Sequence, residues 1–151
     1  MRTVNDILQS KNTPFNQITS DKLVIEALQL LNSVNLSYLI VMDGEEFRGI
    51  FSERDYTRNV ILKGRASTET KVGEVMSTDI PMVEVTDTVE QCMNKMNSYR
   101  TRYLLAYDDE KFKGVITIHD LLREVISAKE NVFDHSITHQ LIENDESGKI
   151  Y

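Results

Sequence analysis

Apolar residues recur with a helical period at two places in the chain, and two short apolar runs follow each of them. The apolar positions 24, 27, 28 and 31 follow the steps i, i+3, i+4 and i+7, and the positions 89, 92, 93 and 96 repeat those steps. This period puts the apolar side chains on one face of an α-helix. The runs at 38–42 and 103–107 each lead through an acidic turn into a second apolar run, a pattern typical of a β-hairpin.

These two stretches are copies of one another. A shift of 65 residues aligns residues 24–61 with residues 89–126 without a gap, and 13 of the 38 pairs are identical, which indicates a duplicated unit. Strands are expected before the first helices, at 15–19 and 82–86, and further helices at 55–62 and 120–127. Each unit is then β-α-β-β-α, a small three-stranded sheet with two helices, and the fold class is α/β (α+β). Such a sheet cannot cover its apolar face alone, so we expect the two units to pack together.

The repeat sets the expected domain boundaries. The first domain is placed at 1–65, with a short N-terminal helix at 4–8, and the second at 66–130. The segment "VGEVM" at 72–76 is the counterpart of "VNDIL" at 4–8. Residues 131–151 are expected to form a C-terminal helix or tail, whose apolar stripe predicts a homodimer interface. The stripe comprises Val132, Phe133, Ile137, Leu141 and Ile142.

Net charge and hydropathy exclude some classes of partner. The formal charge is -7 and the pI is about 5.0, which argues against binding along a nucleic-acid backbone. No apolar run approaches the roughly 18 to 20 residues that a membrane helix needs, and the first thirty residues do not resemble a signal peptide. We therefore expect a cytoplasmic protein with no nucleic-acid or membrane partner.

Candidate catalytic and metal-binding groups are few. The single cysteine, Cys92, lies among apolar residues at helical spacing and is interpreted as a core residue. His119 and Asp120 are adjacent on a predicted helix and point about 100° apart, so they do not form a dyad. His135 and His139 stand at i and i+4 but lack a third ligand, so no metal site is expected. No nucleophile or acid–base pair can be assembled, so we predict a protein that is not an enzyme.

One motif occurs in both copies, "GIFSERD" at 49–55 and "GVITIHD" at 114–120. Its hydroxyl and aspartate have the spacing of a helix N-cap, in which both side chains satisfy free backbone N–H groups. The same groups suit a nucleotide, because a helix start attracts phosphate and a carboxylate accepts hydrogen bonds from ribose hydroxyls. The motif glycines, Gly49 and Gly114, allow a ligand or another backbone segment to come close. Capping and ligand binding are compatible.

With two such motifs in two units of about sixty residues, the chain resembles a tandem pair of cystathionine-β-synthase (CBS) domains, the Bateman module. Residues 52–76 also resemble the linker of stand-alone bacterial and organellar CBS-pair proteins. The resemblance implies pseudo-twofold packing, flat dimers, and clefts between the units that bind adenosyl compounds. It implies no obligatory cofactor, but a regulatory ligand: AMP, ADP, ATP, NAD or S-adenosylmethionine.

The resemblance also implies a role for each matching residue. Asp55 and Asp120 would hold ribose hydroxyls. The phosphate side would comprise Ser52, Thr117, Arg54, Arg58, Arg100 and Arg102. The adenine side would comprise Phe15, Asn16, Ile18, Pro81, Met82 and Val83. The copies are unequal, because Asn35 and Ser37 stand in the first where the second has Arg100 and Arg102.

Two functions remain open from the sequence. The first is a regulatory sensor that binds an adenosyl compound and signals to an unidentified partner protein by a conformational change. The alternative is a protein-interaction scaffold in which the nucleotide sites are vestigial and the Ser/Thr-x-x-Asp pairs are helix caps alone.

Overall fold

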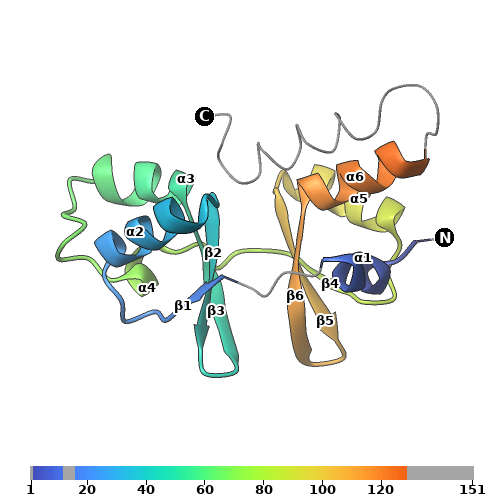
Figure 1. The fold of residues 1–151 in the computed structure, drawn as a ribbon, viewed down its shortest axis with the longest axis horizontal. Coiled ribbons are helices and arrows are strands. Elements are labelled where there is room, and N and C mark those ends of the chain that lie inside the picture. The colour runs from blue at the N-terminus through green and yellow to red at the C-terminus, as the bar shows by residue number, and fades with distance from the viewer. Residues whose placement is uncertain (1, 12–15, 129–151) are drawn as a thin grey trace. The chain divides into compact units, whose positions relative to one another are not determined.

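The structure, a computed structural model of the 151-residue chain, describes residues 2–11 and 16–128. The chain folds as two compact units, each with its own sheet and helices (Figure 1). Within the described residues, the first-repeat unit comprises residues 16–79, and the second-repeat unit comprises residues 2–11 and 80–128. The predicted C-terminal helix, with His135 and His139, lies outside the described residues, as does Phe15.

The first-repeat unit holds a three-stranded sheet in the order β1-β2-β3. Strand β1 pairs parallel to β2, and β2 pairs antiparallel to β3. The elements in chain order are β1 (Gln17–Ile18), α2 (Val24–Val34), β2 (Tyr38–Asp43), β3 (Glu46–Ser52), α3 (Glu53–Asp55), the π-helix η1 (Tyr56–Ile61) and α4 (Val72–Val75). Helix α2 ends at Asn35, which adopts the left-handed conformation that commonly terminates helices.

The second-repeat unit holds an equivalent sheet in the order β4-β5-β6, with the same parallel and antiparallel pairings. Its elements are α1 (Val4–Ser10), β4 (Met82–Glu84), α5 (Val89–Tyr99), β5 (Tyr103–Asp108), β6 (Lys111–Thr117) and α6 (Ile118–Ala128). The hairpin register shifts at Ala106/Tyr107, and the first-repeat hairpin shifts at the equivalent pair, Val41/Met42. The predicted duplication and the α/β (α+β) fold of each unit are confirmed.

Each unit has its own apolar core. In the first-repeat unit the core joins one face of α2 to the sheet, with Val24, Leu39 and Phe51 fully buried. In the second-repeat unit Cys92 takes part in the equivalent cluster together with Leu104 and Ile116. The helical period identified the buried face of α2. In α5 it identified Cys92 and Met96, but Met93 of the predicted stripe is 42% exposed. Cys92 is a core residue, as predicted.

The short helices α1 and α4 do not pack on the repeats that follow them. Helix α4 precedes the second repeat but packs in the first-repeat unit, where the N–H of Val72 donates to the carbonyl of Lys22 at 2.8 Å. Helix α1 precedes the first repeat but packs in the second-repeat unit, where the N–H of Val4 donates to the carbonyl of Asp87 at 2.9 Å. The compact units thus differ from the expected boundaries at 1–65 and 66–130, because burial of α1 joins residues distant in the sequence.

The last helix differs between the repeats. Both copies were expected to be helical there, and they are, but residues Tyr56–Ile61 form a π-helix whereas α6 is α-helical. The wider turn is visible in the bond from the N–H of Leu62 to the carbonyl of Thr57, five residues before it, at 3.1 Å. Within residues 2–11 and 16–128, no helix has the length and apolar character needed to cross a membrane.

Candidate functional site

The start of helix α3 is closed by the first copy of the repeated motif. The backbone N–H of Ser52 donates to Asp55 Oδ2 at 2.8 Å, and the N–H of Asp55 donates to Ser52 Oγ at 3.2 Å. This reciprocal pair satisfies two backbone donors that the helix itself cannot satisfy. The capping interpretation of the motif is therefore confirmed in the first repeat.

The start of helix α6 has the same geometry. The N–H of Thr117 donates to Asp120 Oδ2 at 2.8 Å, and the N–H of Asp120 donates to Thr117 Oγ1 at 3.2 Å. Both aspartates are nearly buried, Asp55 being 6% exposed and Asp120 2%. Two acidic groups so far removed from water need hydrogen-bond donors or cations around them.

The additional partner of each aspartate differs between the units. In the first-repeat unit the hydroxyl of Ser77 donates to Asp55 Oδ1 at 2.6 Å. In the second-repeat unit the ammonium of Lys11 donates to Asp120 Oδ2 at 2.9 Å, and Arg123 Nη1 donates to Oδ1 at 3.0 Å. Asp55 therefore has a neutral donor where Asp120 has two cations.

Ser77 and Lys11 occupy equivalent places beside the sheet. The backbone N–H of Ser77 donates to the carbonyl of Ile50 at 2.8 Å. The ammonium of Lys11 donates to the carbonyl of Val115 at 3.1 Å. Ile50 and Val115 are the same position of the repeat, 65 residues apart. The ammonium of Lys11 thus contacts the equivalent carbonyl and the aspartate of its unit, as Ser77 does through its N–H and its hydroxyl. Lys11 donates to Oδ2 of its aspartate, however, and Ser77 to Oδ1.

The motif glycine of the first repeat makes room for this segment. A Cβ atom on Gly49 would lie 2.7 Å from the carbonyl oxygen of Ser77, closer than side chains tolerate. Ile50, next to it, forms a two-way backbone bridge with Ser77. In the second copy Gly114 has a φ of 155°, which L-residues rarely adopt. A ligand or another backbone segment was expected to come close to the motif glycine. At Gly49 a backbone segment, that of Ser77, does so.

The arginines predicted for the phosphate side lie on the surface. The side chains of Arg54, Arg58, Arg100 and Arg102 are exposed. Arg100 ends helix α5 in the left-handed conformation, and the carbonyl of Arg102 accepts a hydrogen bond from the N–H of Ile118, at the first residue of α6, at 3.0 Å. The backbone of Arg102 therefore lies beside the start of α6, while its side chain is exposed. Arg123, the counterpart of Arg58, contacts Asp120 directly.

The described residues of the predicted adenine side begin the two parallel edge strands. The carbonyls of Asn16 and Pro81 accept equivalent bonds, both at 3.0 Å, from the N–H groups of Ile40 and Leu105. Met82 is exposed, Ile18 is partly buried, and the Val83 side chain packs in the core. Edge strands leave backbone donors and acceptors on their outer side, which suits recognition of a planar base through the backbone.

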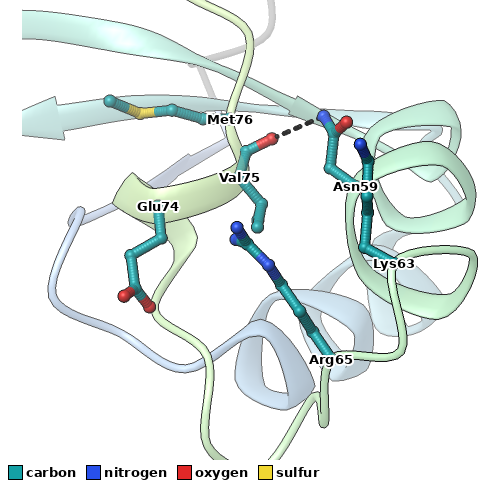
Figure 2. Close-up of a pocket in the computed structure, with 6 residues that line it drawn as sticks. All are labelled: Asn59, Lys63, Arg65, Glu74, Val75 and Met76. Carbon is teal, nitrogen blue, oxygen red and sulfur yellow. Dashed lines mark hydrogen bonds between the residues drawn. The ribbon is translucent and has the colours of Figure 1, made fainter.

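A separate pocket of about 320 Å³ lies in the first-repeat unit, shown in Figure 2. Its lining residues are Asn59, Lys63, Arg65, Glu74, Val75 and Met76. The amide of Asn59 donates to the carbonyl of Val75 at 3.1 Å, which ties η1 to α4 across this pocket. Of the predicted ligand-binding residues that the structure describes, none lines it.

The sequence expectations for metal ligands and for Cys92 can be compared with the described part of the chain. No cluster of three or more His, Cys, Asp or Glu side chains occurs there that could hold a metal ion. Burial raises the pKa of the Cys92 thiol to about 11, with a smaller contribution from the charge of Asp87. A thiol with so high a pKa is protonated at neutral pH and is a poor nucleophile.

Sequence reasoning missed Lys11 and Ser77 as partners of the two aspartates. Lys11 is 109 residues from Asp120, and Ser77 is 22 residues from Asp55. No motif contains either residue. The sequence contained one signal that could have found them. The short helices α1 and α4 correspond to each other, and Lys11 and Ser77 each follow the end of one of these helices by one or two residues.

Comparison with known proteins agrees with the repeat and its motif. The family model for the CBS domain matches residues 4–61 and again residues 72–127. The mitochondrial CBS domain-containing protein CBSX3 of Arabidopsis thaliana is 31% identical over 133 residues. That match covers 82% of this chain and 65% of the relative, so the chain spans slightly less than two thirds of the relative's length.

Solved structures show the same fold. A CBS-domain protein from Burkholderia ambifaria MC40-6 is 34% identical, with a TM-score of 0.77, over 88% of this chain and 100% of that one. CBSX2, solved in complex with AMP, is 25% identical, with a TM-score of 0.69, over 86% of this chain and 100% of that one. Two matches to one family model, on the two halves of an internal duplication, decide the assignment: this chain belongs to the CBS domain family and carries two copies of the domain.

Proposed function

We propose that this protein is a regulatory module without catalytic activity, which binds an adenosyl compound and signals the binding to a partner protein. The observation that carries the proposal is the duplicated helix start, where a nearly buried aspartate lies beside a hydroxyl. AMP bound to the related CBSX2 supports an adenine nucleotide as ligand.

The chemistry of the helix start suits a nucleotide. A carboxylate accepts hydrogen bonds from two neighbouring hydroxyls, as a ribose offers, and Asp55 already accepts one from the hydroxyl of Ser77. The N–H groups and the dipole of a helix start favour an anionic group. Arg54, Arg100 and Arg102 are exposed and available as charge-assisted donors to phosphate. This local positive charge matters because the chain as a whole carries -7.

Signalling requires two states that differ in ligand affinity. A ligand biases such an equilibrium only by the difference between its binding free energies for the two states. In this proposal the ligand hydroxyls replace Ser77 or Lys11 as partner of an aspartate. The segments that follow α4 and α1 then lose one contact each, and the partner protein detects that change.

Isothermal titration calorimetry with AMP, ADP, ATP, NAD and S-adenosylmethionine tests the proposal. We expect binding heat with at least one of these compounds. Asp55→Asn combined with Asp120→Asn should weaken the binding by more than about tenfold, because the amide replaces one of the two acceptor oxygens with an NH2 donor and removes the negative charge. The matched control is Asp109→Asn, at an exposed turn with a φ of 55°, which should leave the affinity unchanged. Folded protein that gives no heat with any of the five compounds contradicts the proposal.

One observation favours the scaffold as a second candidate. Both aspartates already have hydrogen-bond partners within the chain and are 6% and 2% exposed, as helix caps alone would be. On that account Asp120→Ala reduces stability by about 1 kcal/mol or more and changes no affinity for a small molecule. The sensor account requires that the same variant lose ligand affinity while it remains folded. Circular dichroism beside the calorimetric titration separates the two.

A further inference from the structure

The two aspartates are covered by chemically different groups. The hydroxyl of Ser77 covers Asp55, and the ammonium of Lys11 covers Asp120. The positions correspond, since Lys11 and Ser77 also bind equivalent carbonyls, those of Val115 and Ile50. The carboxylate oxygens differ, because Ser77 donates to Oδ1 of Asp55 whereas Lys11 donates to Oδ2 of Asp120, whose Oδ1 accepts from Arg123. The duplication therefore supplies an internal comparison between an aspartate with one neutral donor beside the sheet and an aspartate with two cations.

Lys11 is held in a defined place by its backbone. Its N–H donates to the carbonyl of Ile7 at 3.1 Å, at the end of helix α1. Ile7 in turn lies in the core of the second-repeat unit and is 2% exposed. The side chain of Lys11 is 24% exposed and that of Asp120 1% exposed, so the ion pair is largely shielded from water. Water and salt weaken such a pair much less than a surface pair.

A ligand that replaces the hydroxyl of Ser77 loses less binding free energy than a ligand that replaces the ammonium of Lys11. At Asp55 a ribose hydroxyl replaces a serine hydroxyl, and the carboxylate exchanges one neutral donor for another. At Asp120 a ribose hydroxyl must displace the ammonium from Oδ2, and the carboxylate then loses the attraction of an opposite charge in a site largely shielded from water. The guanidinium of Arg123 remains on Oδ1. The released ammonium also loses its bond to the carbonyl of Val115.

We propose that Lys11 is an internal competitor for ligand hydroxyls at Asp120, so that an adenosyl compound binds at Asp55 first and at Asp120 only weakly. The inference rests on the proposed function, because it concerns the same two carboxylates. It assigns opposite roles to two residues that no sequence motif contains: Ser77 leaves its aspartate accessible to a ligand, and Lys11 blocks its aspartate.

The variant Lys11→Met tests the role of Lys11 with little risk to folding. Methionine keeps most of the apolar stem and removes the ammonium. Asp120 keeps Arg123 at 3.0 Å and the N–H of Thr117 at 2.8 Å, so no unpaired buried charge is created. The matched control is Lys113→Met, which removes an exposed lysine from strand β6 of the same unit.

The experiment is a calorimetric titration of AMP into the wild-type protein and both variants. The wild type should show one stronger site, which Asp55→Asn removes. Lys11→Met should gain affinity at the weaker site by at least about tenfold, ~1.4 kcal/mol, and Asp120→Asn in that background should abolish the gain. Lys113→Met should behave as the wild type.

Two results overturn the inference in distinguishable ways. If AMP binds the wild type and Lys11→Met leaves the weaker site unchanged or weakens it, Lys11 is not a competitor, and the proposed function stands. If neither AMP nor any other compound of the panel binds any variant, the proposed function fails and the inference fails with it.

A second measurement needs no variant. In a nuclear magnetic resonance titration of the wild type with AMP, the amide signals of Ser52 and Asp55 should shift at lower AMP concentration than those of Thr117 and Asp120. If the two pairs of signals shift at the same AMP concentration, or if the signals of Thr117 and Asp120 shift at the lower one, the inference is contradicted.

Discussion

Gly49 lies where the backbone of Ser77 crosses strand β3, and any side chain there would displace that segment. The nearest atom to an added Cβ is the carbonyl oxygen of Ser77 at 2.7 Å, and Met76 Sδ follows at 3.0 Å. Gly49→Ala should therefore lower the free energy of unfolding by about 2 kcal/mol, since overpacking against backbone cannot be relieved by a rotamer change.

Urea denaturation followed by circular dichroism measures this effect. Gly64→Asn is the control, because Gly64 has a φ of +70° and open space around it, and asparagine tolerates that conformation. It should cost less than about 1 kcal/mol. Equal losses for the two variants would contradict the steric account of Gly49.

Cys92 is buried and its thiol has a pKa of about 11 against an ordinary value of 9.0. We expect no reaction with iodoacetamide at pH 7.5 in the native protein and rapid reaction in denaturant. The pKa shift also predicts the sign of a pH dependence. The unfolded thiol ionises above about pH 9 while the folded one stays protonated, so its contribution to stability falls from about pH 9 to about pH 11.

The stability difference between the wild type and Cys92→Ala measures this contribution. Other groups titrate in both proteins and cancel, and the lost sulfur costs the same at every pH. The difference should decrease between pH 8 and pH 11. A difference that stays constant over this range contradicts the raised pKa.

At the scale of elements, the helices and hairpins followed from the sequence because each has a period that can be read locally. Helices α2 and α5 begin where the apolar steps begin, at Val24 and Val89, and continue one turn past the last step, to Val34 and Tyr99. The strands before them are shorter than expected, Gln17–Ile18 against 15–19 and Met82–Glu84 against 82–86. Short edge strands are defined by pairing with a neighbour, which a local pattern does not contain.

The packing of α1 could not be read from the sequence. The helix has two buried residues, Val4 and Ile7, and this short apolar pattern does not indicate which sheet they cover. The choice is fixed by backbone contacts to residues 85 and 87, about eighty positions away. The same long separation concealed Lys11 as the partner of Asp120.

Because α1 packs in the second-repeat unit and α4 in the first-repeat unit, a mutation in either helix should destabilise mainly the unit in which that helix packs. Ile7→Ala removes a side chain from the core of the second-repeat unit, and should cost about 2–5 kcal/mol there. Val75→Ala is the matched change in the first-repeat unit. In native hydrogen exchange, Ile7→Ala should reduce the protection of β5 and β6 more than that of β2 and β3, and Val75→Ala should do the reverse. Loss of protection in β2 and β3 with Ile7→Ala would contradict the assignment of α1.

At the scale of the whole molecule, the duplication identified the fold and the family, and the motif identified the two aspartates. The pseudo-twofold packing of the units, the homodimer and the ligand roles of the individual residues stay predictions. The structure adds that the two copies, which share their sheet pairing and their helix-cap geometry, differ in charge around their central carboxylates. Sequence comparison of the copies could not reveal this difference, because Lys11 and Ser77 lie outside the aligned segments 24–61 and 89–126.

A crystal structure of the protein with AMP tests the central claim most directly. We predict ribose hydroxyl oxygens within about 2.5–3.0 Å of the Asp55 carboxylate, the distance of a hydroxyl hydrogen bond, with the hydroxyl of Ser77 displaced. AMP held elsewhere, for instance in the pocket lined by Lys63 and Arg65, with Asp55 still bonded to Ser77, would contradict the account.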